Sequence, residues 1–425
     1  MTLSRNIETK LWIILFSILL LESNPLKAQN SCAPTQSDST IMAYMAEYGI
    51  KLTDKNEVKL LKSGKEKFID LFQEIEKAKH HIHLEYFNFR NDSIANTLFE
   101  LLAQKAKEGV EVRAIFDAFG NSSNNQPLKK KHLKTIRNNG IEIVKFDPIK
   151  FPWINHVFHR DHRKIAVIDG KIGYTGGMNI ADYYIEGLPE IGEWRDMHIR
   201  IEGNAVTDLQ KIFLDMWNKC TNQAIQGNAY YPYQTDSTYT KKQDKEIAII
   251  DRYPKRNPET MRRVYARAIE TAQKKVQIIN PYFTPTKIIT KAIKKAIQNG
   301  VKVEIMIPGK SDIKFTPDAA LYIANQLRKE GADIYIFNGG FHHSKIMMVD
   351  SLYCTVGSTN LNSRSLRYDY EVNAFVFDTE TTHELIAMFT DDKEDSTLLT
   401  AEMYKKRSVW KKFVGWFAHL LTPFL

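Results

Sequence analysis

Two stretches of this sequence share one pattern: HRKIAVIDGKIGYTGGMN at residues 162–179 and HSKIMMVDSLYCTVGSTN at residues 343–360. Each begins with H-x-K-x4-D, where x is any residue, and ends in a small-residue turn followed by asparagine. The second copy begins 181 residues after the first, and the shared positions keep that offset. A single His-x-Lys pair is often only structural, but a whole set of polar residues repeated in register indicates a duplicated functional unit.

The sequence around the two motifs repeats as well. Gly109 and Gly300 each follow an amphipathic stretch and precede an alternating apolar run, which predicts a helix that ends before a strand. Gly140 and Gly331 open a further alternating run, and both glycine pairs are 191 residues apart. Strand-like runs also precede the two predicted helices. This order predicts an α/β fold of two tandem sandwich domains that form one shared active site.

These patterns divide the chain into segments. The stretch 221–246 suits a surface linker because it is polar and contains Gly, Pro and several Ser, Thr and Lys residues. The predicted organisation is a signal peptide or membrane anchor at 1–28, a lead-in at 29–60, a first domain at 61–220, the linker at 221–246, a second domain at 247–395 and a basic amphipathic C-terminal segment at 396–425.

The spacing within each motif predicts one chemically active face. Residues two apart on a strand point the same way, so His162 projects with Lys164 and His343 with Lys345. Imidazoles can attack phosphorus and protonate a leaving alcohol, and lysine holds a phosphate as a point charge. The small-residue turns let donors approach a phosphate closely. No carboxylate or cysteine cluster at metal-ligand spacing supports zinc binding, so we expect no catalytic metal and no cofactor.

The paired motifs resemble the phospholipase D superfamily, and within it the chain is similar to bacterial cardiolipin synthases. This resemblance extends over roughly residues 55 to 425. One departure is that familiar cardiolipin synthases have two N-terminal membrane spans, whereas this chain has one short apolar segment. The stretches that carry the closer similarity are 83–87 (HLEYF), 193–196 (EWRD), 201–203 (IEG), 280–283 (NPYF), 305–312 (IMIPGKSD), 364–365 (RS) and 420–425 (LLTPFL).

The resemblance implies ping-pong transfer through a phosphohistidine. We take His162 as the nucleophile and His343 as the acid, although the symmetry of the sequence also permits the reverse. Asp169 and Asp350 are expected to fix the histidine tautomers. Glu371 is either a further site residue or a surface carboxylate. The groups expected to hold the phosphate oxygens are Lys164, Lys345, Asn179, Asn360, Gly177 and Ser358.

In this interpretation one phosphatidylglycerol donates its phosphatidyl group and a second accepts it, which yields cardiolipin and glycerol. Water as the acceptor would make the protein a phospholipid hydrolase, and a secreted nuclease or phosphodiesterase of the same superfamily is a further alternative. A net charge of +9 favours anionic partners of either kind. Nucleic acid is not the expected partner, because no nucleic-acid-binding module is recognisable. The oligomeric state is left open.

Both ends of the chain point to a membrane surface. The apolar run LWIILFSILLL at 11–21 predicts a signal peptide cleaved after Ala28, or a short anchor. Either would carry the body of the protein out of the cytosol, and we expect it at the cell membrane, on the periplasmic or outer face of the inner membrane. Near the C-terminus, lysines alternate with aromatic residues at helical spacing over 405–421. That pattern predicts either a helix in an anionic membrane interface or a terminal helix docked on the protein's own core.

Overall fold

The computed structural model describes residues 36–148, 158–234, 244–313 and 316–421, and the predicted signal peptide or anchor lies outside them. The elements of the first half are α2 (Gln36–Glu47), β1 (Leu52–Leu61), α3 (Gly64–Lys77), β2 (His81–Tyr86), α4 (Ser93–Lys107), β3 (Glu111–Asp117), α5 (Ala118–Ser123), α6 (Lys130–Asn138), β4 (Glu142–Phe146), β5 (Lys164–Ile168), β6 (Ile172–Gly176), α7 (Tyr183–Glu186), β7 (Trp194–Arg195), β8 (His198–Gly203), α8 (Val206–Thr221) and the short 3-10 helices η2 (Asn228–Tyr230) and η3 (Pro232–Gln234).

The second half repeats this order with its own additions at the end. Its elements are β9 (Lys245–Arg252), α9 (Thr260–Thr271), β10 (Lys275–Ile279), α10 (Lys287–Gln298), β11 (Lys302–Pro308), α11 (Thr316–Glu330), β12 (Asp333–Phe337), β13 (Phe341–His342), β14 (Ile346–Val349), β15 (Tyr353–Gly357), α12 (Ser363–Arg367), β16 (Glu371–Phe377), α13 (Thr379–Glu394), β17 (Ser396–Leu398), α14 (Ala401–Lys406) and α15 (Val409–Leu421).

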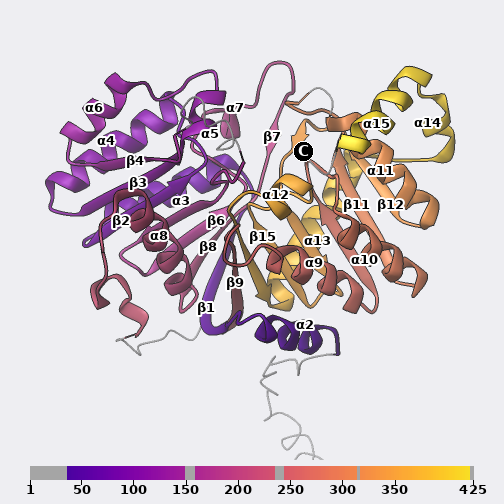
Figure 1. Ribbon diagram of the computed structural model, residues 1–425, viewed down its shortest axis with the longest axis horizontal. Coiled ribbons are helices and arrows are strands. Elements are labelled where there is room, and N and C mark those ends of the chain that lie inside the picture. The colour runs from indigo at the N-terminus through magenta and orange to yellow at the C-terminus, as the bar shows by residue number, and fades with distance from the viewer. Residues whose placement is uncertain (1–35, 149–157, 235–243, 314–315, 422–425) are drawn as a thin grey trace, which may run out of the picture. The chain divides into compact units, whose positions relative to one another are not determined.

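One sheet runs through both halves. Its strand order is β17-β12-β11-β10-β14-β15-β16-β9-β1-β8-β6-β5-β2-β3-β4, so the order is nearly the same when read outward from β9 or from β1. The halves join where β1 and β9 pair antiparallel, and Figure 1 shows this junction between the indigo and orange halves. The predicted α/β fold, built twice, is confirmed. β1 lies mostly in the stretch 29–60 that we expected to be a lead-in, yet it is a central strand.

Local sequence explains the repeated strand, helix, strand unit. In each half three consecutive strands run parallel: β3 pairs with β2 and β4, and β11 pairs with β10 and β12. Parallel neighbours require a crossover between them, which the helices supply. Gly109 and Gly300 follow the crossover helices with φ of +92° and +82°, as predicted for residues that end a helix in the left-handed region. All residues of β2 and β5 are buried, although only β5 (KIAVI) is almost continuously apolar and β2 (HIHLEY) alternates polar and apolar residues.

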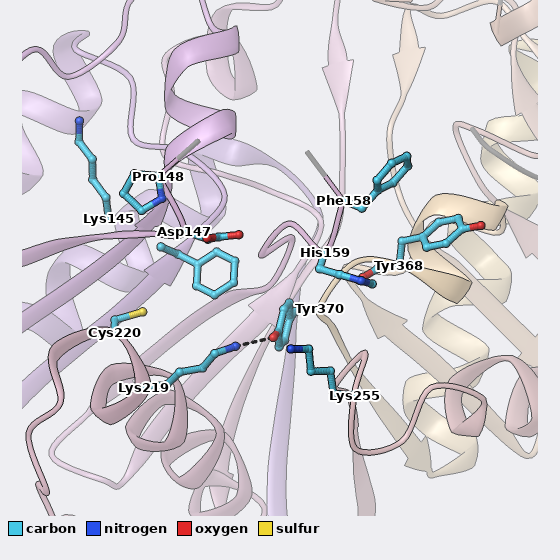
Figure 2. A pocket seen from close by; sticks show the side chains of 11 residues that line it. Lys145, Asp147, Pro148, Phe158, His159, Lys219, Cys220, Lys255, Tyr368 and Tyr370 are labelled. Carbon is cyan, nitrogen blue, oxygen red and sulfur yellow. Dashed lines mark hydrogen bonds between the residues drawn. The ribbon is translucent and has the colours of Figure 1, made fainter. Parts of the chain in front are cut away.

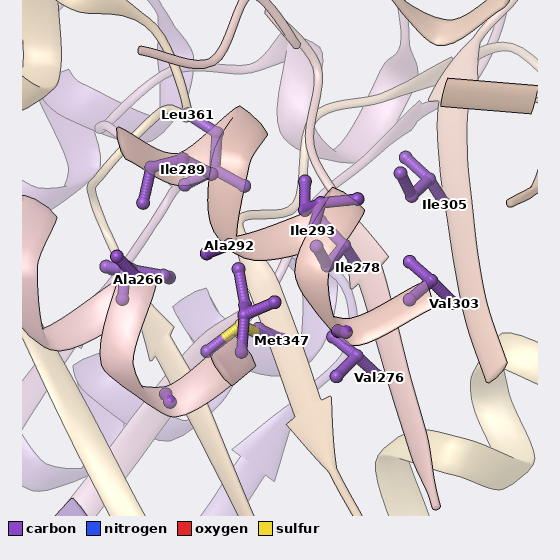
Figure 3. Close-up of a cluster of buried hydrophobic side chains, with 14 of the residues drawn as sticks. Ala266, Val276, Ile278, Ile289, Ala292, Ile293, Val303, Ile305, Met347 and Leu361 are labelled. Carbon is purple, nitrogen blue, oxygen red and sulfur yellow. The ribbon is translucent and has the colours of Figure 1, made fainter. Parts of the chain in front are cut away.

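Each half has its own apolar core, and a further core joins the two. In the second half, Ile289 and Ile293 of α10 pack toward Val276 of β10 and Val303 of β11 (Figure 3). In the first half, α3, α4 and α6 cover the sheet in the same way. The joining core is drawn from both halves and includes Ile165 and Val167 of β5 and Ile346 and Met348 of β14. Because β5 and β14 each follow a His-x-Lys segment, this core holds the two motifs together.

The C-terminal segment is helical, as its spacing predicts. α14 and α15 follow β17, and α15 lies against α11 (Figure 1). Within the described part of the chain, no helix combines the length and apolarity needed to cross a membrane.

Candidate active site

Backbone hydrogen bonds to the opposite half of the chain hold the two His-x-Lys segments in place. The amide of His162 donates to the carbonyl of Tyr370 (3.0 Å), and the amide of His343 donates to the carbonyl of Arg195 (2.6 Å). β7 and β13 form a separate two-stranded sheet that pairs Trp194 with Phe341, one residue from each half. These contacts place both histidines at the junction of the halves.

Each imidazole is held by a buried carboxylate of the other half. His162 Nδ1 lies 3.1 Å from Glu371 Oε1 and 3.2 Å from Oε2, and Glu371 begins β16 of the second half. His343 Nδ1 lies 2.6 Å from Oδ2 of Asp196, which follows β7 of the first half. Both carboxylates are buried. With Nδ1 donating to a carboxylate, the Nε2 atom of each ring is left as the nitrogen that can accept or carry a reacting group.

The two carboxylates are themselves positioned by equivalent turn residues. Ser358 Oγ donates to Glu371 Oε2, so this predicted phosphate ligand instead braces the carboxylate. Its counterpart in the first half is Gly177, where a Cβ atom would lie 2.1 Å from Asp196 Oδ1. Gly177 therefore leaves the space that Asp196 occupies, while the amide of Met197 donates to Asp196 Oδ1 (2.7 Å). Gly177 and Ser358 therefore position the two carboxylates, and their direct binding of phosphate stays a prediction.

The lysines and asparagines of the motifs converge on the same centre. Lys164 and Lys345 are almost fully buried, and Lys345 Nζ lies 3.1 Å from Nε2 of His343. Asn179 and Asn360 are also buried, and the side-chain oxygen of each has no hydrogen-bond partner among the described residues. A buried ammonium suits an anionic ligand, and the amide NH2 groups can donate to its oxygens. The unpaired amide oxygens need a donor, which a hydroxyl group of the same ligand can supply.

Asp169 and Asp350 are not at this centre, which corrects our expectation that they orient the histidines. Asp169 accepts hydrogen bonds from the amides of Lys79, His80 and His81 (2.9, 2.7 and 3.0 Å). Asp350 accepts three equivalent bonds, from the amides of Gln273, Lys274 and Lys275. Both aspartates have a φ of +53° and sit at the far end of β5 or β14. They cap the turn that enters β2 or β10, so their role is structural.

Burial and the neighbouring charges set the protonation of the histidine pair. Burial lowers the pKa of His162 well below its usual value, and the charges of Lys164, Lys345 and His343 lower it further. Burial and Lys345 also lower the pKa of His343, while Asp196 acts in the opposite direction. His162 is therefore neutral at pH 7, the form a nucleophile requires.

The lysines and carboxylates are shifted as well. Burial lowers the pKa of Lys164 to about 7 and that of Lys345 to about 8, in both cases against the opposing effect of nearby carboxylates. Burial raises the pKa of Glu371 to about 7. Burial would also raise the pKa of Asp196, but Lys345 and His343 hold it below its usual value. A bound phosphodiester anion would favour the charged form of both lysines.

Sequence patterns predict no role for two residues of the site, Asp196 and Lys67. Asp196 ends the EWRD stretch, yet nothing local marks it as the partner of a histidine 147 residues later. Lys67 of α3 is fully buried and donates to the carbonyls of Met178 (3.2 Å) and Asn179 (2.9 Å), so it fixes the first small-residue turn. A lysine in an amphipathic helix gives no such signal, because most helical lysines are exposed.

The other histidines near the motifs have structural partners. His342 Nε2 lies 2.9 Å from Asp392 Oδ2, and His159 Nδ1 lies 2.7 Å from the carbonyl of Tyr368. His156 lies outside the described residues. Among the residues that the structure describes, no group of three or more His, Cys, Asp or Glu side chains is arranged to hold a metal ion.

A cavity of about 880 Å³ lies behind the segment that carries Glu371, between the two halves (Figure 2). Lys219 and Tyr370 meet in it, where Lys219 Nζ donates to Tyr370 Oη (2.5 Å). Adjacent residues of an extended segment point to opposite sides, so Tyr370 faces this cavity while Glu371 faces His162. The described residues that line the cavity include neither of the paired histidines. The cavity therefore backs the reaction centre and is distinct from it.

The comparison with known families agrees with this geometry. The family model described as cardiolipin synthase, PLD-like domain, matches residues 71–217 and 265–393. The chain belongs to this family. Each of the two matched regions contains one of the paired histidines and one of the two carboxylates that orient them. The resemblance in the paired motifs is therefore confirmed.

Relatives within the family include named cardiolipin synthases. The cardiolipin synthase of Listeria monocytogenes serotype 4b (strain CLIP80459) is 38% identical over 380 residues, which is 89% of this chain and 77% of that protein. Cardiolipin synthase 1 of Bacillus anthracis is 33% identical over 377 residues, 88% of this chain and 73% of that protein.

Solved structures show the same fold at much lower sequence identity. The phosphatidylserine synthase of Haemophilus influenzae Rd KW20 covers 91% of this chain and 99% of its own length, with a TM-score of 0.69 and 15% identity. The polyphosphate kinase of Porphyromonas gingivalis covers 85% of this chain and 52% of its own length, with a TM-score of 0.54 and 13% identity. At these identities the likeness establishes the fold alone.

Proposed function

We propose that this chain is a cardiolipin synthase that transfers a phosphatidyl group from one phosphatidylglycerol to another. The observation that carries the proposal is the crossed pairing of the two histidines, in which His162 and His343 are each held at Nδ1 by a carboxylate of the other half. Neither Nε2 atom is occupied by a carboxylate, so both can act on one phosphorus, one as nucleophile and one as acid. Relatives at 38% identity support phosphatidylglycerol as the substrate.

In the first step, Nε2 of His162 attacks the phosphorus of phosphatidylglycerol. The bond from phosphorus to the headgroup glycerol oxygen breaks, and Nε2 of His343 gives its proton to that oxygen, so that glycerol leaves. This step needs the imidazolium form of His343, which Asp196 and the bound phosphodiester anion favour against the opposing effects of burial and Lys345. Lys164, Lys345 and the amides of the two turn asparagines surround the non-bridging oxygens and stabilise the charge of the pentavalent transition state. A larger exposed fraction of the His162 side chain, 16% against 7% for His343, supports His162 as the attacking group.

In the second step, a glycerol hydroxyl of another phosphatidylglycerol attacks the phosphohistidine. His343, now neutral, takes the hydroxyl proton, the phosphorus–nitrogen bond breaks, and cardiolipin forms while His162 regains its neutral state. Asp196 stabilises the imidazolium form of His343 in each round, because its carboxylate stays ionised. Both histidines therefore return to their starting protonation states after each cycle, and the phosphatidyl group leaves in cardiolipin.

The substrate places the reaction at a membrane, where both phosphatidylglycerol molecules reside. An anionic phospholipid fits the net charge of +9 and the two buried lysines of the site. Export to the periplasmic or outer face of the inner membrane is part of the proposal and rests on the apolar run at 11–21.

A product analysis tests the proposal against its alternatives. Purified protein is given phosphatidylglycerol vesicles and, separately, phosphatidylethanolamine vesicles, single-stranded DNA and double-stranded DNA. Cardiolipin together with glycerol, formed only from phosphatidylglycerol, is the expected result. Phosphatidic acid as the sole lipid product would mean that water is the acceptor and the protein is a hydrolase. DNA cleavage without lipid turnover would make it a nuclease with the same histidine chemistry.

A further inference from the structure

α15 packs one face on the protein through close contacts. Gly415 lies on this face, where a Cβ atom would be 2.6 Å from the carbonyl oxygen of Asp318 in α11. The rings of His419 and Tyr322 lie 5.3 Å apart, and Arg407, just before α15, forms an ion pair with Asp318. α15 is thus docked on α11, which was one of the two roles predicted for this segment.

The opposite face of α15 is apolar and exposed, which docking on α11 alone does not explain. Trp410 is 70% exposed, and Phe413, Phe417 and Leu420 are each about half exposed. Their spacing of three or four residues places them in one stripe along the helix. The rings form a ladder, with centroids 5.7 Å apart from Trp410 to Phe413 and 5.8 Å from Phe413 to Trp416. Such a continuous aromatic stripe on a surface marks an interaction site.

α11 connects this stripe to the reaction centre. The chain just before α11 carries Asp312, which accepts a hydrogen bond from Tyr282 Oη (2.7 Å). The Tyr282 ring lies 5.8 Å from the ring of His343, and Asp312 contributes to the electrostatic field at both His343 and Lys345. The segment that precedes α11, the helix on which α15 docks, therefore contacts one edge of the catalytic site.

The charges around the stripe indicate what covers it. Lys405 and Lys406 lie in α14, and Lys411 and Lys412 lie in α15. Within the described residues, Lys405 and Lys411 form no ion pair, while Lys406 pairs with Glu402. Tryptophan and phenylalanine beside a group of lysines match the interface of an anionic bilayer, where rings enter the acyl boundary and ammonium groups meet the headgroups.

We infer that the outward stripe of α15 inserts into the interface of an anionic membrane and, through α11, holds the histidine site against the lipid headgroups. The inference rests on the proposed function, because it concerns how that site reaches a lipid substrate. In this arrangement one face of α15 contacts α11 and the opposite face contacts the bilayer. The docked face makes the helix a rigid positioning element for the site.

Tryptophan quenching tests whether the stripe enters the bilayer. The full-length protein and a Trp410→Phe/Trp416→Phe variant are mixed with phosphatidylglycerol vesicles that carry bromine on the acyl chains. The variant keeps an apolar stripe and should still bind, so the difference between the two proteins reports on these two rings. We expect them to be quenched in vesicles containing phosphatidylglycerol. Bound protein in which neither ring is quenched would overturn the inference.

Matched variants test whether insertion serves catalysis. Phe413→Ser/Phe417→Ser should lower the turnover of phosphatidylglycerol vesicles about tenfold or more, because two half-exposed rings lose their apolar contact with lipid. Hydrolysis of a soluble phosphodiester should stay unchanged. Ile69→Ser is the control, because Ile69 on α3 is equally exposed but lies outside the stripe.

Three outcomes of this experiment contradict the inference. The first is an equal loss of turnover on both substrates, and the second is no loss of turnover on vesicles. The third is conversion of a dimer to a monomer by the variant, which would show that a second copy covers the stripe. If wild-type protein makes no cardiolipin but the two tryptophans are quenched, the proposed function fails and the membrane contact stands.

Discussion

We expect each histidine of the pair to react through Nε2, because a carboxylate from the other half of the chain occupies Nδ1. The arrangement has a chemical consequence. Glu371 has a pKa raised to about 7 by burial, whereas Asp196 is held ionised, so the two imidazoles differ in the charge beside them. Two nearly identical motifs can therefore take different roles in one cycle.

The buried lysines predict how activity depends on pH. Lys164 and Lys345 have pKa values lowered by burial to about 7 and about 8, and they bind phosphate only as cations, the form that predominates below the pKa. The kcat/KM for a soluble phosphodiester should fall as the pH rises through 7 to 8. Glu371→Gln removes a charge that raises both lysine pKa values, so this decline should move to lower pH. Asp169→Asn is the control, and a decline that stays in place or moves upward in Glu371→Gln would contradict the assignment.

The motif aspartates predict an effect on stability instead. Asp169→Asn keeps a side chain that tolerates the positive φ but weakens three hydrogen bonds to backbone amides. The free energy of unfolding should fall by about 1–2 kcal/mol, with kcat of the folded enzyme nearly unchanged. Thermal unfolding and steady-state kinetics on the same preparation measure both quantities. Asp350→Asn should behave alike, and a hundredfold loss of kcat in either variant would return these residues to the catalytic centre.

Sequence alone could reach part of this site, for reasons visible in particular residues. His162 and Lys164 are recognisable because a strand repeats every two residues and the whole motif recurs. Asp196 and Glu371 are not, since their pairing depends on how the two halves meet and leaves no local spacing. Asp169 keeps a fixed distance from His162 because it ends the same strand, so regular spacing wrongly suggested a shared chemical role.

Among the elements, the short β7–β13 pair has the most direct effect on the site. It sets the backbone of Arg195 beside that of His342, immediately before the Asp196–His343 contact. Gly340 permits this approach, because a Cβ atom there would lie 2.3 Å from the carbonyl oxygen of Glu193. Each strand has only two residues, one aromatic and one basic (Trp194-Arg195 and Phe341-His342), so periodicity cannot predict this pair.

Gly340→Ala should therefore separate Asp196 from His343. We expect kcat/KM to fall roughly 10- to 100-fold, since a misplacement of about 1 Å in a catalytic group has effects of that size. Gly300→Ala is a matched control: it also has a positive φ, but nothing lies within 4 Å of the added Cβ. Both variants should lose some thermal stability from backbone strain, whereas only Gly340→Ala should lose activity. Similar kinetics in the two variants would show that the β7–β13 approach does not position the pair.

At the scale of the whole molecule, the duplicated sheet explains why one site forms from two motifs. The strand order reads alike outward from β1 and from β9, and the joining core packs β5 and β14 residues together. The repeat offset predicts two such units, and the strands of each unit follow from apolar periodicity. The antiparallel junction of β1 and β9 does not follow, because β1 is mostly polar and reads as a lead-in (LTDKNEVKLL).

A single site made from two halves predicts that the histidines fail in different ways. With a p-nitrophenyl phosphodiester, the leaving phenolate needs no proton, so His343→Ala should still form the covalent adduct on His162 and release one equivalent of p-nitrophenol per site. The adduct should then persist, because the second step lacks its base. His162→Ala should give no burst. Rapid mixing with acid quench and mass analysis of the modified peptide measures both outcomes. A burst in His162→Ala and none in His343→Ala would reverse the two roles, and near-normal turnover in either variant would exclude the two-histidine cycle.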